Sequence, residues 1–319
     1  MNTLTTSMFA AAALGLSLFT AAPSDGCDGC GATKLQVSKP TSQNIVETAM
    51  ADDRFETLVA AVKAAGLVDT LSGEGPFTVF APTDDAFAAL PEGTLEKLLE
   101  PENRALLTGI LTYHVVPGRL AAADVVKRSG AVTVNGQQLD FSVTEPKKEG
   151  DPTIVRADGA RIVATDLRCS NGVIHVIDAV VMPADENIVE TAKGAGTFGT
   201  LLAAAKAAGL AETLAEGGPF TVFAPTDDAF AALPDGTVES LLRPENRERL
   251  ATILKHHVVA GRVYSSQVVA DGFVTTLAGT KLRAAVDDDG ATIGGARLAR
   301  VDLDASNGVV HVVDSVLLP

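Results

Sequence analysis

Three side chains have the types that a hydrolase uses for nucleophilic catalysis. Thr83 offers a hydroxyl, His114 a base and Asp178 a carboxylate that would orient the base. The sequence has none of the motifs that accompany such chemistry, namely a Gly-x-Ser-x-Gly elbow, a phosphate-binding glycine loop or a His-Glu-x-x-His helix. Thr83 is also explained as a helix N-cap, because Asp84 and Asp85 follow it in the first predicted turn. We therefore expect no catalytic residues and no enzyme activity.

Few residues have the spacing of metal ligands. Cys27 and Cys30 form a Cys-x-x-Cys pair, which suits a disulfide or half of a zinc site, but no second pair or nearby His completes four ligands. The segment 287–290 (DDDG) lacks the alternating ligand spacing of a calcium loop and is more simply a hairpin turn. We expect no metal ion and no cofactor, and a Cys27–Cys30 disulfide stays open as an alternative.

The N-terminus resembles an export signal. An apolar run from Met8 to Ala22 is too short to span a bilayer as a helix and ends in small residues. This pattern predicts a signal peptide over residues 1–22, a Cys-containing linker over 23–43, and an extracellular or cell-envelope protein without a transmembrane span. A lipid anchor on Cys27 is disfavoured, because the residues before it lack the usual apolar position. No Asn-x-Ser/Thr sequon occurs, so N-glycosylation gives no support to a eukaryotic secretory origin. A bacterial envelope or secreted protein fits the sequence equally well.

Composition disfavours nucleic acids and anionic membrane surfaces as partners. The 25 Lys and Arg residues against 40 Asp and Glu give a net charge of −15, which repels the phosphates of nucleic acids and anionic lipid headgroups. Aromatic residues are only 4 % of the chain and Trp is absent, which disfavours a binding site built from stacked rings. We therefore expect no nucleic-acid partner.

The dominant pattern is an internal repeat. The segment PFTVFAPTDDAFAALP from Pro76 to Pro91 recurs unchanged from Pro219 to Pro234. The segment from Asn171 to Asp178 has a near copy from Asn307 to Asp314. A repeat of this length can bury its own core, unlike the short units of solenoids. Two tandem domains are therefore predicted, over residues 44–183 and 187–319.

Each copy begins with helical patterns and ends with strands. Apolar residues at helical spacing precede Gly66, which is placed to stop a helix, and Pro101 suits the first position of another. Turn signals then separate strand-like segments over 131–134, 138–143, 153–157, 161–168 and 173–181. The first copy is longer than the second, and we place its extra residues in a surface loop at 145–152. Helices followed by an antiparallel β-region predict an α+β fold.

Each copy resembles a fasciclin domain. The resemblance rests on the FTVFAPTDDAF block (77–87 and 220–230), the central Tyr113-His114 segment, and the NGVIHVIDAVVMP block (171–183, with its counterpart at 307–319). It implies an α+β fold in which a β-sandwich wedge is bordered by helices. It also implies an extracellular or envelope protein that mediates adhesion to a matrix or cell-surface protein or polysaccharide.

The resemblance also marks candidate partner-binding residues, because the Tyr-His segment has been linked to integrin binding in animal relatives. These candidates are Tyr113 and His114 in the first copy and His256 and His257 in the second. The second copy lacks the tyrosine and no Arg-Gly-Asp tripeptide occurs. The two departures disfavour an integrin-like receptor but leave the adhesive role open.

The spacing of the same residues also suits an alternative, in which His114 is a core residue. Helical spacing places His114 on an apolar stripe, where a histidine is usually a core residue with a hydrogen-bond partner. Two positions of a neighbouring helix face differ between the copies. Arg249 in the second copy replaces Leu106 of the first, and His256 replaces Tyr113. We therefore expect a wetter face in the second copy, and a better contact surface, centred on Tyr113, in the first.

Polar residues on the last predicted strand are expected to hold the fold together. Asp178 shares its side of the strand with apolar residues, so its carboxylate must be hydrogen-bonded or protonated. We predict that Asp178 and Asp314 anchor buried polar networks. The predicted structural residues are Thr83, Asp84, His175 and Asp178, with Thr226, Asp227, His311 and Asp314 in the second copy.

These expectations combine into a non-catalytic adhesion protein with two fasciclin-like domains. The alternative is a carrier that holds a small apolar ligand or pigment in a cleft of the same domains. The sequence makes no prediction about oligomeric state.

Overall fold

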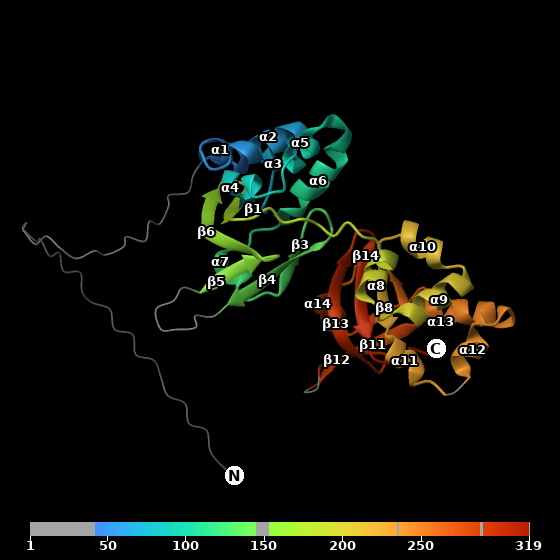
Figure 1. Cartoon of the computed structure of the whole chain (residues 1–319). Coiled ribbons are helices and arrows are strands. Elements are labelled where there is room, and N and C mark those ends of the chain that lie inside the picture. Colours follow the sequence, from blue (N-terminus) through green and yellow to red (C-terminus); the bar gives the residue numbers. More distant parts are fainter. Residues whose placement is uncertain (1–41, 145–152, 235, 288–289, 319) are drawn as a thin grey trace, which may run out of the picture. The chain divides into compact units, whose positions relative to one another are not determined.

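The structure is a computed structural model that describes residues 42–144, 153–234, 236–287 and 290–318. Two domains follow one another, each with most of its helices before most of its strands and with a seven-stranded sheet (Figure 1). The helices of the first domain are α1 (Ile45–Met50), α2 (Glu56–Ala65), α3 (Val68–Ser72), α4 (Asp84–Ala88), α5 (Thr94–Leu99), the 3-10 turn η1 (Pro101–Asn103), α6 (Arg104–Tyr113) and α7 (Ala122–Val125). Its strands are β1 (Phe77–Pro82), β2 (Val115–Pro117), β3 (Gly130–Val132), β4 (Gln138–Thr144), β5 (Ile154–Ala157), β6 (Ala160–Cys169) and β7 (Gly172–Ile177).

The second domain repeats this order. Its helices are α8 (Ile188–Ala195), α9 (Gly199–Ala208), α10 (Ala211–Glu216), α11 (Asp227–Ala231), α12 (Thr237–Leu241), the 3-10 turn η2 (Pro244–Asn246), α13 (Arg247–His256) and α14 (Ser265–Asp271). Its strands are β8 (Phe220–Pro225), β9 (Val258–Ala260), β10 (Phe273–Thr275), β11 (Lys281–Asp287), β12 (Gly290–Ile293), β13 (Ala296–Ala305) and β14 (Gly308–Val313). The α+β prediction is confirmed.

Strand pairing follows the chain except at one place. The first sheet has the order β2-β1-β7-β6-β5-β4-β3, and the second has the equivalent order. Strands β3 to β7 pair with antiparallel neighbours, as the turn signals predicted. The early strand β1 instead pairs parallel with the last strand β7, with Thr78 opposite Val173. Local patterns do not predict this pairing, because most of the domain connects the two strands.

Each sheet folds back on itself into two layers. The rings of Phe80 in β1 and Phe141 in β4 contact each other with centroids 5.5 Å apart, although β7, β6 and β5 lie between their strands. In a flat sheet, four strand spacings would separate β1 from β4 by about 19 Å. The pairing of β6 with β7 shifts register between Ile162 and Ala164 and again before Leu167, and such bulges bend a strand. This folded sheet is the predicted β-sandwich wedge.

Strand β1 is buried on both faces. Val79 and Ala81 belong to the core shared with α1, α2 and α6, whereas Phe80 belongs to the core between the two sheet layers. Figure 1 shows α1, α2, α5 and α6 gathered at one end of the first domain and β4 and β5 toward the other. The same alternation explains why the FTVFAP segment is apolar at nearly every position.

Most predicted helix ends are observed. Helix α2 stops at Gly66, whose φ of 74° lies in the left-handed region that favours glycine. Pro101 begins the 3-10 turn η1 and not α6 itself, and His114 caps the end of α6 and does not continue it.

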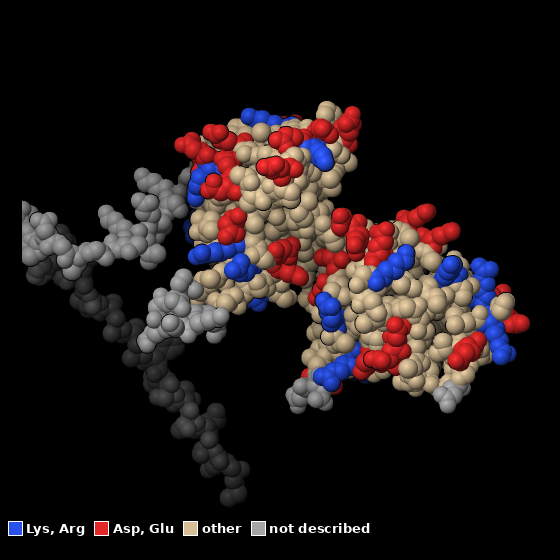
Figure 2. All heavy atoms as spheres, viewed as in Figure 1, with Lys and Arg blue, Asp and Glu red and all other residues tan. Residues whose placement is uncertain are grey.

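Several predictions lie outside the described residues: the signal peptide, the Cys27 and Cys30 pair, and the loop at 145–152. Within the described part of the chain, every helix is too short or too polar to cross a bilayer. Charged side chains are spread over the outer surfaces of both domains (Figure 2).

Candidate functional site

The four residues expected to contact a partner are buried. Tyr113, His114, His256 and His257 each expose 4 % or less of their surface. They lie where α6 and α13 end and the chain continues into β2 and β9. Their burial favours the framework role over partner recognition, and direct recognition through these side chains stays a prediction that requires local opening of the domain.

Both ring nitrogens of His114 have backbone partners. Nδ1 lies 2.8 Å from the Ile110 carbonyl oxygen, and Nε2 accepts the Val181 N–H at 3.3 Å. Because Nε2 accepts, the neutral ring carries its hydrogen on Nδ1. His257 makes the same two contacts, with Ile253 and Leu317. Burial lowers the pKa of both histidines to about 4, so each is a neutral link between a helix end and the segment after the last strand.

Tyr113 and its counterpart His256 have different anchors. The Tyr113 hydroxyl donates to the Gln138 carbonyl oxygen at 2.9 Å and also contacts the Asp158 carboxylate. Burial raises the pKa of Tyr113, so the phenol stays protonated. His256 Nδ1 instead shares a hydrogen bond with the Thr280 hydroxyl. The first contact joins the end of α6 to β4, and the second joins the end of α13 to the turn between β10 and β11.

We predicted that the helix face of the second copy with Arg249 and His256 is more exposed to water. The structure agrees with this prediction at Arg249 but not at His256. Leu106 is 50 % exposed on α6, and Arg249 is exposed at the same place on α13. Tyr113 and His256 are both buried, so exchanging them does not alter the surface. On the helix face that carries Leu106 and Tyr113, the accessible residue is therefore Leu106.

Thr83 caps α4 as predicted, and Asp84 does more than start the helix. Thr83 Oγ1 accepts the Ala86 N–H at 3.3 Å. The Asp84 carboxylate accepts the N–H groups of Glu56 and Thr57 at 3.3 and 2.8 Å, which are the first residues of α2. One carboxylate thus caps a helix that begins 28 residues earlier.

The second domain repeats both caps. Thr226 Oγ1 accepts the Ala229 N–H at 3.2 Å. Asp227 accepts the N–H groups of Gly199 and Thr200 at 3.2 and 2.7 Å. The hydrogen bonds from Thr200 lower the pKa of Asp227, as expected for a carboxylate at a helix N-terminus.

The last strand is anchored by its histidine, and the prediction of a buried Asp178 is wrong. His175 is fully buried, with Nε2 2.9 Å from the Leu120 carbonyl oxygen and Nδ1 accepting the Asp166 N–H at 3.4 Å. Asp178 is exposed just beyond the end of β7, where its Oδ1 accepts the Arg161 N–H at 2.7 Å. Strand β7 is buried throughout, so a carboxylate is accommodated only after it ends.

His311 and Asp314 show the same division in the second domain. His311 Nε2 lies 2.9 Å from the Val263 carbonyl oxygen, and Nδ1 accepts the Asp302 N–H at 3.1 Å. Burial lowers the pKa of His311. Asp314 is exposed and accepts the Arg297 N–H at 2.9 Å.

The structure does not join Thr83, His114 and Asp178 into a catalytic arrangement. Each has its own backbone partners, and no hydrogen bond links any two of the three. This placement agrees with the framework roles described above.

Sequence reasoning missed the role of Asn171, which was interpreted as a turn residue. Its Oδ1 accepts the Ile45 N–H at 2.9 Å, and its Nδ2 donates to the carbonyl oxygens of Leu71 and Gly73 at 2.8 and 2.9 Å. Asn307 repeats this pattern with Ile188, Leu214, Ala215 and Gly217. The repetition of this asparagine in both copies was the available signal.

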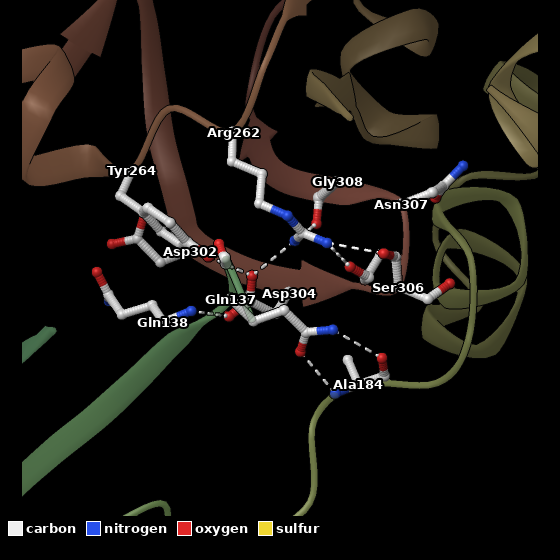
Figure 3. Close-up of polar contacts among 12 residues, drawn as sticks. Gln137, Gln138, Ala184, Arg262, Tyr264, Asp302, Asp304, Ser306, Asn307 and Gly308 are labelled. Carbon is white, nitrogen blue, oxygen red and sulfur yellow. Dashed lines mark hydrogen bonds and ion pairs between the residues drawn. The ribbon is translucent and has the colours of Figure 1, made fainter. Parts of the chain in front are cut away.

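In the second copy, a cluster of polar contacts surrounds Arg262 (Figure 3). The guanidinium donates to the carbonyl oxygens of Gly308 and Ser306 at 2.6 and 2.8 Å and pairs with Asp304 at 3.3 Å. The Tyr264 hydroxyl donates to the same Asp304 oxygen at 2.7 Å. Burial raises the pKa of Asp304 to about 6. The cluster holds the turn between β13 and β14, and the first copy has Arg168 where the second has Asp304.

An apolar cavity lies between the helices and the sheet of each domain. In the second domain it has a volume of about 360 Å³ and is enclosed by α8, α9, α10 and α13 over β8, β9 and β14. The equivalent cavity of the first domain measures about 30 Å³, which is the space of roughly one water molecule. His114 and His257 each form part of the wall.

Side-chain size accounts for the direction of this difference. At three wall positions the second domain carries the smaller residue: Ala205 for Val62, Ala211 for Val68 and Val310 for Ile174. Each change removes carbon atoms from the wall. At a fourth position, the mouth of the cavity has Lys193 where the first domain has Met50.

Comparison with known proteins gives a family. The fasciclin domain matches residues 53–183 and 196–319. Protein sll1483 of Synechocystis sp. is 53 % identical over 149 residues, which cover 46 % of this chain and 78 % of that protein. Transforming growth factor-beta-induced protein ig-h3 of Oryctolagus cuniculus is 34 % identical over 250 residues, which cover 78 % of this chain and 35 % of that protein. The solved FAS1 domain pair of the insect cell adhesion molecule fasciclin I aligns with 86 % of this chain and 96 % of that chain, at 18 % identity and a TM-score of 0.42.

The chain therefore belongs to the fasciclin domain family, and it carries two such domains in tandem. The family predicted from the repeated motifs is confirmed. The matched region spans about a third of the length of the transforming growth factor-beta-induced protein.

Proposed function

We propose that this protein is a secreted or envelope adhesion protein, which binds a matrix or cell-surface protein or polysaccharide through its fasciclin domains without catalysis. The observation that carries the proposal is the family match in both domains, with 34 % identity to the transforming growth factor-beta-induced protein over 250 aligned residues. The apolar segment from Met8 to Ala22 supports export.

The contact surface of this proposal is the outer face of α6 in the first domain. Leu106 is 50 % exposed there, and Leu99 of the preceding helix is 38 % exposed. An exposed leucine on a helix face provides apolar area for a partner, whereas the charged Arg249 occupies the same position in the second domain. The hydroxyl of buried Tyr113 contacts Gln138 and Asp158 and so fixes the end of this helix against the rest of the domain.

A paired exchange tests the contact surface. The full chain is immobilised and incubated with envelope material from its host, and the bound protein and polysaccharide are quantified. We expect Leu106→Arg to reduce the bound amount while the melting temperature stays unchanged, because the second domain already carries arginine at this position. Arg249→Leu is the matched control and should not reduce binding. Equal binding by the parent and Leu106→Arg would overturn the assignment of this face, and no binding by the parent would overturn adhesion itself.

Export is tested separately. Fractionation of the host, followed by N-terminal sequencing of the recovered protein, should place it outside the cytosol with a new N-terminus close to residue 23. Recovery in the cytosol with Met1 retained would contradict this part of the proposal.

A second candidate function is carriage of a small apolar ligand. The 360 Å³ cavity of the second domain favours it, since ligand cavities in proteins range from about 300 to 1,000 Å³. An apolar molecule that copurifies with the native protein would support this function.

A further inference from the structure

The cavity of the second domain can accept only an apolar group. Apart from its two lysines, the one polar residue in its wall is His257. Both ring nitrogens of His257 are already bonded, to Ile253 and Leu317. Apart from the two lysines, the side chains of the wall therefore offer no free hydrogen-bonding group to water, and apolar cavities without such groups bind apolar ligands or stay dry.

The volume of the cavity limits the size of its occupant. A volume of about 360 Å³ is near the lower end for ligand cavities. One alkyl chain fits this space better than the paired chains of a membrane lipid.

Two lysines mark the mouth of the cavity. Lys193 on α8 and Lys206 on α9 both border it, and both are exposed to solvent. Among the described residues, neither lysine forms an ion pair. In the first domain Met50 replaces Lys193, and the cavity is nearly closed. The paired cations and the open cavity therefore occur together in one domain of a chain whose net charge is −15.

We propose that this cavity binds a single-chain carboxylate amphiphile of the fatty-acid class, with the alkyl tail inside the cavity and the carboxylate at Lys193 and Lys206. The assignment rests on the second candidate function, carriage of an apolar ligand, and adds the domain, the ligand class and the headgroup contacts. Exposed lysines attract a carboxylate modestly, whereas burial of the tail supplies most of the affinity. The same lysines discriminate against a neutral molecule with an identical tail.

Titration calorimetry on the delipidated full chain tests the proposal, with dodecanoate and its neutral counterpart dodecanol as probes. We expect one dodecanoate per chain. The double variant Lys193→Met/Lys206→Met should weaken dodecanoate binding about fivefold and leave dodecanol binding unchanged. Ala205→Val/Ala211→Val, which introduces the first-domain residues, should weaken both probes by about tenfold or more. The reverse change in the first domain, Val62→Ala/Val68→Ala, is the control for altered helix packing and should not weaken either probe.

The outcomes separate the ligand class from the carrier function. Equal binding of both probes, unaffected by the lysine variant but lost in the valine variant, would keep the carrier function and overturn the carboxylate assignment. Dodecanoate binding that persists in the valine variant would overturn the location. Absence of binding by either probe would overturn both. Thermal melting without ligand confirms that each variant is folded.

Discussion

The side chain of Asn171 accepts a hydrogen bond from the backbone N–H of Ile45 at 2.9 Å, across 126 positions of the chain. The same amide donates to the carbonyl oxygens of Leu71 and Gly73. A single residue before β7 therefore connects the start of α1 and the end of α3 to the sheet. Because Asn307 repeats the arrangement, the same asparagine connects the helical layer to the sheet in each domain.

Removing this amide should destabilise its own domain. Asn171→Ala removes three hydrogen bonds and leaves backbone groups unpaired, so we expect a loss of about 3 kcal/mol in the free energy of unfolding. Urea denaturation measures the loss. Asn103→Ala is the control. Asn103 donates to one backbone carbonyl, that of Lys97, and at 3.4 Å to the Glu100 carboxylate, so its loss should cost about 1 kcal/mol. Equal losses in the two variants would contradict the fastening role.

A second prediction concerns the carboxylate that caps α2 from a distance. Asp84→Ala leaves the N–H groups of Glu56 and Thr57 without their acceptor and should cost about 1 to 2 kcal/mol. Asp85→Ala is the matched control, since Asp85 lies in the same helical turn but is exposed, and it should change stability by less than about 0.5 kcal/mol. Thermal or urea unfolding ranks the two variants. A smaller loss in Asp84→Ala than in Asp85→Ala would exclude the cap.

The third prediction separates His175 in the last strand from Asp178, which follows that strand. His175→Leu removes a buried ring that makes two hydrogen bonds. It should cost about 3 kcal/mol in the free energy of unfolding, because the Leu120 carbonyl and the Asp166 N–H are left without partners. Asp178→Ala removes one exposed hydrogen bond and should cost about 1 kcal/mol. Denaturation midpoints give the order. The reverse order would restore Asp178 as the main anchor.

Features that depend on neighbouring residues were predictable from the sequence. Thr83 as a cap, Gly66 as a helix end and the antiparallel order of the later strands all follow from contacts within a few positions. The repeated blocks also gave the family, because their order and duplication are specific.

Features that depend on distant residues were not predictable. Asn171 has the pattern of a turn residue, and its partners in the helical layer are visible only in the folded chain. The alternation rule placed Asp178 on a buried face because it could not show that β7 ends at Ile177. The cavity arises from changes such as Val62 to Ala205, which keep the apolar pattern and alter only the volume.

The last prediction is a loss of stability in mild acid. Burial lowers the pKa of His114 and His257 from 6.5 to about 4 in the folded chain. Between these values the unfolded state binds protons that the folded state excludes, so stability is complete above pH 6.5 and falls as the pH decreases toward 4. Asp304 is partly buried and its pKa is raised to about 6, so it opposes this change, because its folded form binds the proton more readily.

A histidine variant isolates this effect from the carboxyl groups. For the parent, we expect His114 alone to contribute a loss of about 2 kcal/mol in the free energy of unfolding between pH 7.5 and pH 5. His114→Gln should be less stable at every pH but should lack this part of the slope. Urea denaturation at several pH values compares the two profiles. Parallel profiles would show that His114 is charged in the folded protein, and its bond to Val181 would then need another explanation.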